Sequence, residues 1–108
     1  MSQNQTQEVD VQAVHTAMQN GDAVLIDVRE PWEYDELHIP GSLLIPLGEV
    51  PARLGEIPSD RDVYVHCRLG GRSAKAVDFL REAGRPRAVN VTGGIEAWAA
   101  AGLPTAVG

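Results

Sequence analysis

The sequence has a single cysteine, no long hydrophobic run and fewer basic than acidic residues. One cysteine excludes an internal disulfide, and together with only three histidines it argues against a structural zinc site. No apolar stretch approaches the roughly 20 residues of a membrane-spanning helix, and the polar start lacks a basic and then apolar signal region. We therefore expect a soluble, cytoplasmic protein without a metal or other cofactor.

The acidic excess amounts to a formal net charge of −6. This charge repels phosphate backbones and anionic headgroups, so we expect neither nucleic acid nor a membrane as a partner. Positive charge is nevertheless concentrated at one place, where Arg68, Arg72 and Lys75 follow the only cysteine, Cys67. This local cluster predicts that a small anion binds beside the thiol.

The 108 residues are enough for one domain with one hydrophobic core. We expect a disordered lead-in over residues 1–8 and a single domain over 9–108. Apolar segments predict strands at 23–28, 42–45, 62–67 and 88–91. Helical patterns with their start and stop residues predict helices at 11–20, 31–37, 73–83 and 95–101, and a weaker one at 47–55. This alternation predicts an α/β fold, a parallel sheet with helices on both faces, in which Trp32 and Trp98 are packing residues.

Cys67 stands between the predicted strand and the helix at 73–83, in a short glycine-rich segment. Ligands of such folds bind at the carboxyl ends of the strands, and the amino end of a helix offers free N–H groups and a positive dipole. Gly70 and Gly71 allow positive φ angles that turn the loop amides inward. A cysteine in this field loses its proton easily, and the thiolate is its reactive form. The segment therefore predicts covalent catalysis on an anionic sulfur or oxyanion substrate.

The neighbours of Cys67 have different expected roles. Adjacent residues of a strand point to opposite faces, so His66 is expected to face away from Cys67 and to be structural. Arg68 either contacts the substrate or points to solvent, and Leu69 is expected at a hydrophobic rim. Arg72 stands at the helix start, where its charge opposes the dipole, and this placement makes sense if an anion lies between them.

Asp27 and Arg29 follow the first predicted strand at the same edge of the sheet. Two interpretations of this pair stay open. Either the residues form a local ion pair with Glu30 or Glu33, or they brace the catalytic loop from the neighbouring strand.

Four segments share one known pattern in order and spacing. They are Ile26-Asp27-Val28-Arg29-Glu30 with Glu33-Tyr34, His38-Ile39-Pro40-Gly41-Ser42, Cys67-Arg68-Leu69-Gly70-Gly71-Arg72-Ser73, and Gly93-Gly94-Ile95 with Trp98, Gly102 and Pro104. Together they resemble the single-domain rhodanese-like sulfurtransferases. The resemblance implies a five-stranded parallel sheet flanked by helices.

The resemblance also implies a reaction. Cys67 takes a sulfane sulfur from thiosulfate or a similar donor, carries it as a persulfide and passes it to cyanide or a thiol. The amides of residues 68–73 would cradle the terminal sulfur, with Arg68 on the donor's sulfonate and Arg72 closing the loop. Leu69 departs from the small polar residue frequent in the family, and this departure bears on the native donor.

Three other functions stay open. A persulfide carrier that delivers sulfur to a partner protein uses the same chemistry, so the sequence does not separate it from the enzyme. A phosphatase or arsenate reductase of related fold also uses a cysteine in an anion-binding loop. The family comparison implies that the loops of such phosphatases have five residues between cysteine and arginine, whereas four separate Cys67 from Arg72 here. A non-catalytic interaction module has no need for the intact cysteine and loop.

Overall fold

Parallel strands alternate with helices in the computed structural model, which describes residues 8–21 and 23–108. The strands are β1 (Glu8–Val9), β2 (Ala23–Asp27), β3 (Leu43–Leu44), β4 (Asp62–His66) and β5 (Ala88–Val91). The helices are α1 (Val11–Asn20), α2 (Pro31–Glu36), α3 (Gly71–Glu82) and α4 (Gly94–Ala100), with two 3-10 turns, η1 (Leu47–Glu49) and η2 (Leu54–Glu56). The predicted α/β fold is confirmed, and the bounds of the predicted strands and of these four helices hold to within a residue or two.

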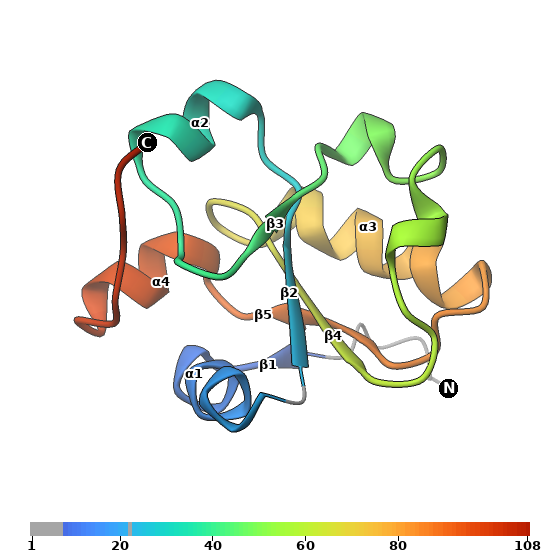
Figure 1. Ribbon diagram of the computed structural model, residues 1–108, viewed down its shortest axis with the longest axis horizontal. Helices are drawn as coiled ribbons and strands as arrows, with labels where there is room; N and C mark the ends of the chain where they lie inside the picture. The colour runs from blue at the N-terminus through green and yellow to red at the C-terminus, as the bar shows by residue number, and fades with distance from the viewer. Residues whose placement is uncertain (1–7, 22) are drawn as a thin grey trace.

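The five strands form one sheet in the order β1-β5-β4-β2-β3, and every neighbouring pair is parallel. β4 is central, with its neighbours on either side in Figure 1. Its last residue, His66, is in register with Asp27 of β2, and Val65 is in register with Asn90 of β5. Cys67 therefore leaves the sheet at the middle of its carboxyl edge, between the ends of two other strands, where ligands of such sheets bind.

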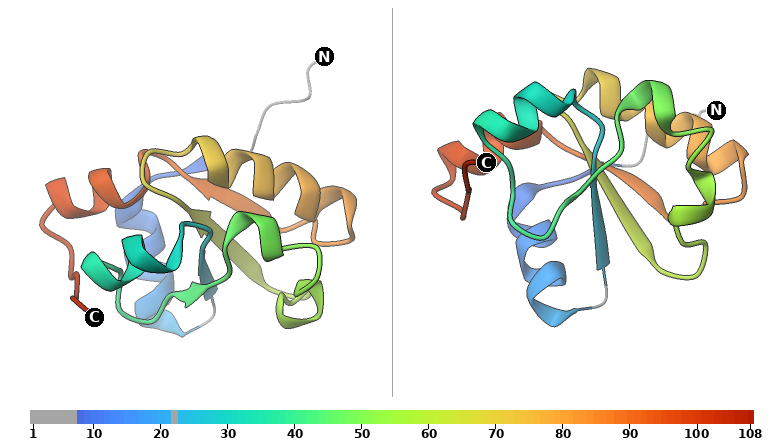
Figure 2. Two further views of the ribbon diagram at one scale, coloured as in Figure 1. Left: turned by 90° about the horizontal axis from the view of Figure 1, so that it is seen from above. Right: turned by 45° about the horizontal axis from the view of Figure 1, so that its top comes forward.

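Helices cover both faces of the sheet (Figure 2). α3 and the two 3-10 turns pack on one face, and α1 and α4 pack on the other. Alternate residues of β4 enter these two cores: Val63 and Val65 lie in the core under α3 together with Cys67, whereas Tyr64 lies under α1 and α4. Burial on both faces explains why the central strands are almost continuously apolar.

α2 stands at the carboxyl edge, directly after β2, and the chain's C-terminal segment lies beside it (Figure 1). The backbones of His38 and Ala106 exchange two hydrogen bonds of 2.8 Å, and the Gly108 N–H donates to the Asp35 carbonyl. These contacts fasten α2 to the segment that follows α4. They thereby connect the two sides of the cleft described below.

Two predictions of secondary structure need correction. Glu8, predicted to end the disordered lead-in, instead belongs to β1 and is in register with Asn90 of β5. The rest of the predicted lead-in lies outside the described residues. Residues 47–55 do not form a helix; they contribute to two separate 3-10 turns, with Pro51 between them. Proline has no N–H to donate to a preceding carbonyl, so a continuous helix through this segment is disfavoured.

The two tryptophans differ in burial. Trp98 is 1% exposed, as predicted for a packing residue, but Trp32 is 63% exposed on α2 and does not belong to the core. Within the described part of the chain, no helix is both long and apolar enough to cross a membrane.

Candidate active site

The sulfur of Cys67 lies inside a loop that closes onto the first turn of α3. Its Sγ accepts hydrogen bonds from the Gly70 N–H at 3.0 Å and from the Ser73 hydroxyl at 3.3 Å. Gly70 has φ +122°, a backbone conformation that other residues rarely adopt and that turns its N–H toward the sulfur. Gly71, contrary to the sequence prediction, does not have a positive φ, because it is already the first residue of the helix.

Hydrogen bonds favour the ionised form of this thiol. Burial raises the pKa of Cys67, but the Ser73 hydroxyl and the backbone N–H groups of Ser73, Gly70 and Leu69 lower it by a larger amount. The pKa of Cys67 therefore lies below its ordinary value, as expected for a nucleophilic cysteine. Amides and a hydroxyl, not arginines, provide the hydrogen bonds to the sulfur.

Arg72 is engaged by a carboxylate on another helix. Its guanidinium donates to both oxygens of Glu33 in α2, at 2.7 and 2.9 Å. The side-chain hydrogen bond from Arg72 lowers the pKa of Glu33 to about 2, against the opposing effect of burial. The anion that accompanies Arg72 is thus Glu33 itself. Lys75, the third member of the basic cluster, is exposed on α3.

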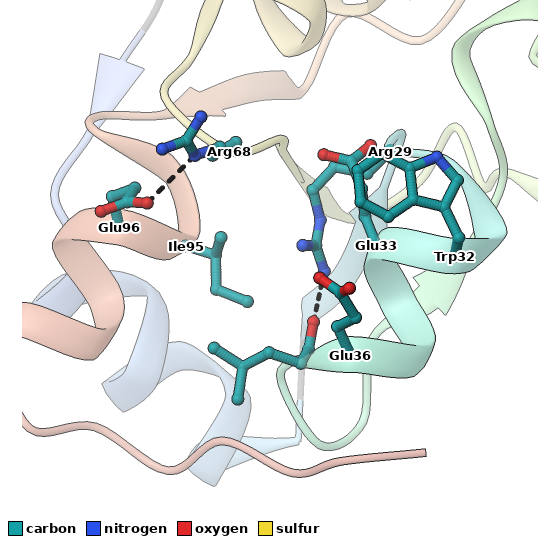
Figure 3. A pocket seen from close by; sticks show the side chains of 8 residues that line it. Arg29, Trp32, Glu33, Glu36, Arg68, Ile95 and Glu96 are labelled. Atoms are coloured by element: carbon teal, nitrogen blue, oxygen red, sulfur yellow. Dashed lines mark hydrogen bonds and ion pairs between the residues drawn. The ribbon is translucent and has the colours of Figure 1, made fainter.

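A cleft of about 360 Å³ borders the loop through Arg68 (Figure 3). On one side of this cleft, Arg68 forms an ion pair of 3.0 Å with Glu96 of α4, and Trp32 and Glu36 of α2 stand on the other. The Arg68 side chain is 62% exposed and that of Glu96 is 53% exposed, so a ligand in the cleft can reach both. Leu69 is 64% exposed, and its place at a hydrophobic rim stays a prediction.

Asp27 and Arg29 pair with each other and not with Glu30 or Glu33. Both are buried, and the Arg29 guanidinium donates to the Asp27 carboxylate at 2.8 to 3.2 Å and to the Leu37 carbonyl at 2.7 Å. The alternative local ion pair is therefore wrong as stated. The pair stands at the end of β2 beside the catalytic loop, and its role in bracing that loop stays a prediction.

His66 is fully buried and hydrogen-bonds, through Nδ1, to the carbonyl of Cys67 at 3.2 Å. Its Nε2 lies 3.6 Å from Asp27 Oδ2. Burial lowers the pKa of His66, against the opposing effects of the Asp27 charge and of the Cys67 carbonyl. The ring contacts the Cys67 backbone and not its sulfur, in line with the structural role predicted for it.

Two further contacts support the loop from behind. Asn90 of β5 is buried; its Oδ1 accepts from Ser73, and its Nδ2 donates to the Gly70 carbonyl. The carbonyls of Cys67 and Arg68 accept from N–H groups in the first turn of α4. Asn90 was not among the predicted site residues, although a lone polar side chain inside the apolar strand 88–91 was a signal for it.

No three His, Cys, Asp or Glu side chains of the described residues converge as ligands for a metal ion. The site contains one thiol with a lowered pKa, whose sulfur accepts hydrogen bonds from the Gly70 N–H and the Ser73 hydroxyl. Residues 10–101 match the family described as the rhodanese-like domain. The chain belongs to this family.

Relatives of known sequence and structure agree with this family membership. The chain is 46% identical over 83 residues to a sulfurtransferase from Allochromatium vinosum, a match that covers 77% of this chain and 78% of that protein. It is 39% identical over 74 residues to Bacillus subtilis YrkF, which bears the provisional name of a sulfur carrier protein; the match covers 68% of this chain and 40% of that longer relative. The crystal structure of a rhodanese-related protein from Thermoplasma volcanium superposes with a TM-score of 0.86 at 30% identity, covering 94% of this chain and 99% of the other.

Proposed function

We propose that this rhodanese-like protein moves a sulfane sulfur from thiosulfate, or a similar small anionic donor, to a thiol or cyanide through a persulfide on Cys67. The observation that best supports the proposal is the pair of donors on Sγ, the Gly70 N–H and the Ser73 hydroxyl. They favour the thiolate, and they stabilise the negative charge that develops on Sγ when Cys67 leaves in the second displacement. In the best-measured enzyme, one such preorganised donor contributes about 3–4 kcal/mol to the rate.

The reaction proceeds in two displacements at sulfur. The Cys67 thiolate attacks the outer sulfur of thiosulfate; one S–S bond forms, the S–S bond of thiosulfate breaks, and sulfite leaves with the electron pair. The persulfide carries its negative charge on the terminal sulfur, facing the amides of residues 68–73. The acceptor then attacks this terminal sulfur, and Cys67 leaves as a thiolate. The cycle balances without an added oxidant or reductant.

Arg68 is the residue we propose for the donor's sulfonate. It lines the cleft beside the loop, where a sulfonate would compete with Glu96 for its guanidinium. Both side chains are more than half exposed, and an ion pair between such groups is weak in water. Replacing the Glu96 carboxylate by the donor's sulfonate at Arg68 therefore costs little free energy.

Intact-mass spectrometry after incubation with thiosulfate tests the covalent step. We expect a gain of one sulfur atom per chain, which cyanide or a small thiol removes. Cys67→Ser should show neither the mass gain nor turnover, because the chain has no other thiol. A wild-type protein that gains no sulfur but releases phosphate from an activated aryl phosphate would contradict the proposal and favour the phosphatase alternative.

A persulfide carrier is the second candidate, and the likeness to YrkF favours it. The chemistry at Cys67 is then the same, but the acceptor is a cysteine or another nucleophile of a partner protein. The two candidates differ in how fast small acceptors discharge the persulfide. The carrier would be favoured if thiosulfate converted all of Cys67 to the persulfide, but small thiols and cyanide accelerated removal of the terminal sulfur only weakly.

A further inference from the structure

Asn90 holds a fixed orientation behind the catalytic loop. Its side chain is 98% buried by the surrounding protein, since only 2% of the residue is exposed. Nδ2 donates to the Gly70 carbonyl at 3.2 Å, and because a carbonyl can only accept, the amide oxygen must face the other way. That oxygen, Oδ1, lies 2.6 Å from the hydroxyl of Ser73.

The Ser73 hydroxyl has one proton and two acceptors within reach. It lies 2.6 Å from Asn90 Oδ1 and 3.3 Å from the sulfur of Cys67. A hydroxyl donates one hydrogen bond at a time, so the two acceptors compete for it. Ser73 is fully buried, which leaves little opportunity for water to satisfy the acceptor that loses.

We propose that Asn90 is a positioning residue that competes with the Cys67 sulfur for the Ser73 proton and so sets how strongly Ser73 donates to that sulfur. When Cys67 is a thiolate, its full charge attracts the proton. When the sulfur is a neutral thiol, the short contact to Oδ1 is the better one. Asn90 thus gives the hydroxyl a second resting place.

The proposal rests on the proposed function only for its place in the cycle. In the persulfide the negative charge moves to the terminal sulfur, so Sγ becomes a poor acceptor and the Ser73 proton returns to Asn90. When an acceptor removes the terminal sulfur, the leaving Cys67 thiolate regains the hydrogen bond. The hydroxyl would then change partner twice in each turnover without any movement of the loop.

The titration of Cys67 tests the proposal independently of sulfur transfer. Thiolate absorbance in the ultraviolet against pH reports this one thiol, and the Cys67→Ser counterpart of each variant supplies the blank. Every other ionisable group on the elements around the loop stays unchanged in each variant, including those that form ion pairs there: Asp27, Arg29, Glu33, His66, Arg68, Arg72 and Glu96.

Asn90→Leu removes the competing acceptor, so Ser73 donates to the sulfur alone and Cys67 should titrate at lower pH. Ser73→Ala removes the donor, and Cys67 should titrate at higher pH, with about tenfold less thiolate at a pH below the midpoint. The informative comparison is the double variant: in the Ser73→Ala background, Asn90→Leu loses only its hydrogen bond to the Gly70 carbonyl, so it should shift the Cys67 titration less than it does with Ser73 present. The proposal would be overturned if Asn90→Leu raised the midpoint pH of the Cys67 titration. It would also be overturned if Asn90→Leu shifted that midpoint equally with and without Ser73.

Asn90→Asp is the matched control, because aspartate has the same size and also loses the donor to the Gly70 carbonyl. Aspartate remains an acceptor for Ser73 and adds negative charge. Asn90→Asp should therefore raise the midpoint pH of the Cys67 titration, whereas Asn90→Leu lowers it. If Asn90→Leu does not fold, Asn90→Asp still decides: its effect must be larger with Ser73 present than in Ser73→Ala. Equal effects would leave only the added charge and would refute the competition. Absence of sulfur transfer with these titrations intact would count against the proposed function alone.

Discussion

The Glu33 carboxylate compensates the charge of Arg72 beside the catalytic loop. The hydrogen bond from Arg72, opposed by burial and assisted by the Glu30 N–H, lowers the pKa of Glu33 from 4.5 to about 2. A carboxyl whose pKa is depressed in the folded state stabilises the fold while it is ionised in both states. This stabilisation is complete above about pH 4.5 and is lost as the pH falls toward about 2.

Glu33→Gln should therefore reduce the free energy of unfolding at neutral pH by about 1–2 kcal/mol, a figure discounted because Arg72 is partly exposed to solvent. The variant should also lose less stability than the wild type between neutral pH and about pH 2, because the titrating group is gone. Urea unfolding at a series of pH values measures both effects.

Glu36→Gln is the control for this prediction. Glu36 lies on the same helix and lines the same cleft, but it is exposed and Arg72 does not contact it. Its replacement should leave both the stability and its pH slope close to those of the wild type. If Glu33→Gln kept the wild-type slope, the ion pair with Arg72 would contribute nothing to acid stability.

The residues that surround the Cys67 sulfur could be grouped from the sequence because they are close in the chain. Cys67, Gly70 and Ser73 lie on one strand-to-helix connection, and the chemistry of a thiol before glycines and a helix start identifies them together. Glu33 lies 39 positions before its partner Arg72, and Asn90 lies 17 positions after Ser73. No periodicity specifies contacts across such distances, which depend on how β2, β4 and β5 are ordered in the sheet.

α4 supports the Cys67 loop through two backbone hydrogen bonds. The N–H groups of Ile95 and Glu96 donate to the carbonyls of Cys67 and Arg68, at 3.0 and 3.2 Å. This approach requires a glycine at position 94, where φ is +58°. A Cβ there would lie 2.3 Å from the Cys67 carbonyl oxygen and 2.6 Å from that of Arg68, distances that only a shift of the backbone could relieve.

Gly94→Ala should therefore displace the loop and impair both stability and persulfide formation. We expect a loss of about 2–4 kcal/mol, since backbone strain and a backbone clash add at one position. Urea unfolding measures the stability, and the rate at which thiosulfate adds sulfur to Cys67 measures the effect on the loop.

Gly102→Ala separates the two causes. Gly102 follows α4 with φ +75°, but a Cβ there would meet nothing within 4 Å. This variant should cost only the strain of a positive φ, about 1 kcal/mol, and should form the persulfide at the wild-type rate. If Gly94→Ala and Gly102→Ala lost equal stability, the close contact between Gly94 and the carbonyls of the loop would not matter for stability.

At this scale the alternation of strands and helices was predictable, and the edge strand β1 was not. β2 and β4 are apolar on both faces along most of their length, and such continuous apolar segments predict buried parallel strands. β1 has only two residues, Glu8 and Val9, and owes its strand conformation to pairing with β5. Its formation depends on a partner about 80 residues away, so local sequence gave no sign of it.

Taken as a whole, the molecule is acidic around a site whose arginines are compensated. The net charge is −6, while Arg29, Arg68 and Arg72 each pair with a carboxylate. The principal extents are 36, 26 and 25 Å. At about 0.01 M salt the Debye length is roughly 30 Å, so most of the molecule's charges act at Cys67, whereas at about 0.15 M it is roughly 8 Å and only charges near the site do.

Salt should therefore change how charged reagents reach Cys67. We expect a methanethiosulfonate reagent with an anionic group to react more slowly than its cationic counterpart at low salt, because the net charge of the molecule repels it. As salt is added, the ratio of the anionic to the cationic rate should rise severalfold, since the distant carboxylates are screened first. The ratio cancels any restriction that the loop places on both reagents, and Cys67→Ser should react with neither. Glu96→Gln, which frees Arg68 at the cleft, should raise the ratio at every salt concentration. A ratio that falls as salt is added would mean that the arginines beside Cys67 keep an attractive field despite their carboxylate partners, and that the local cluster governs the approach of anions.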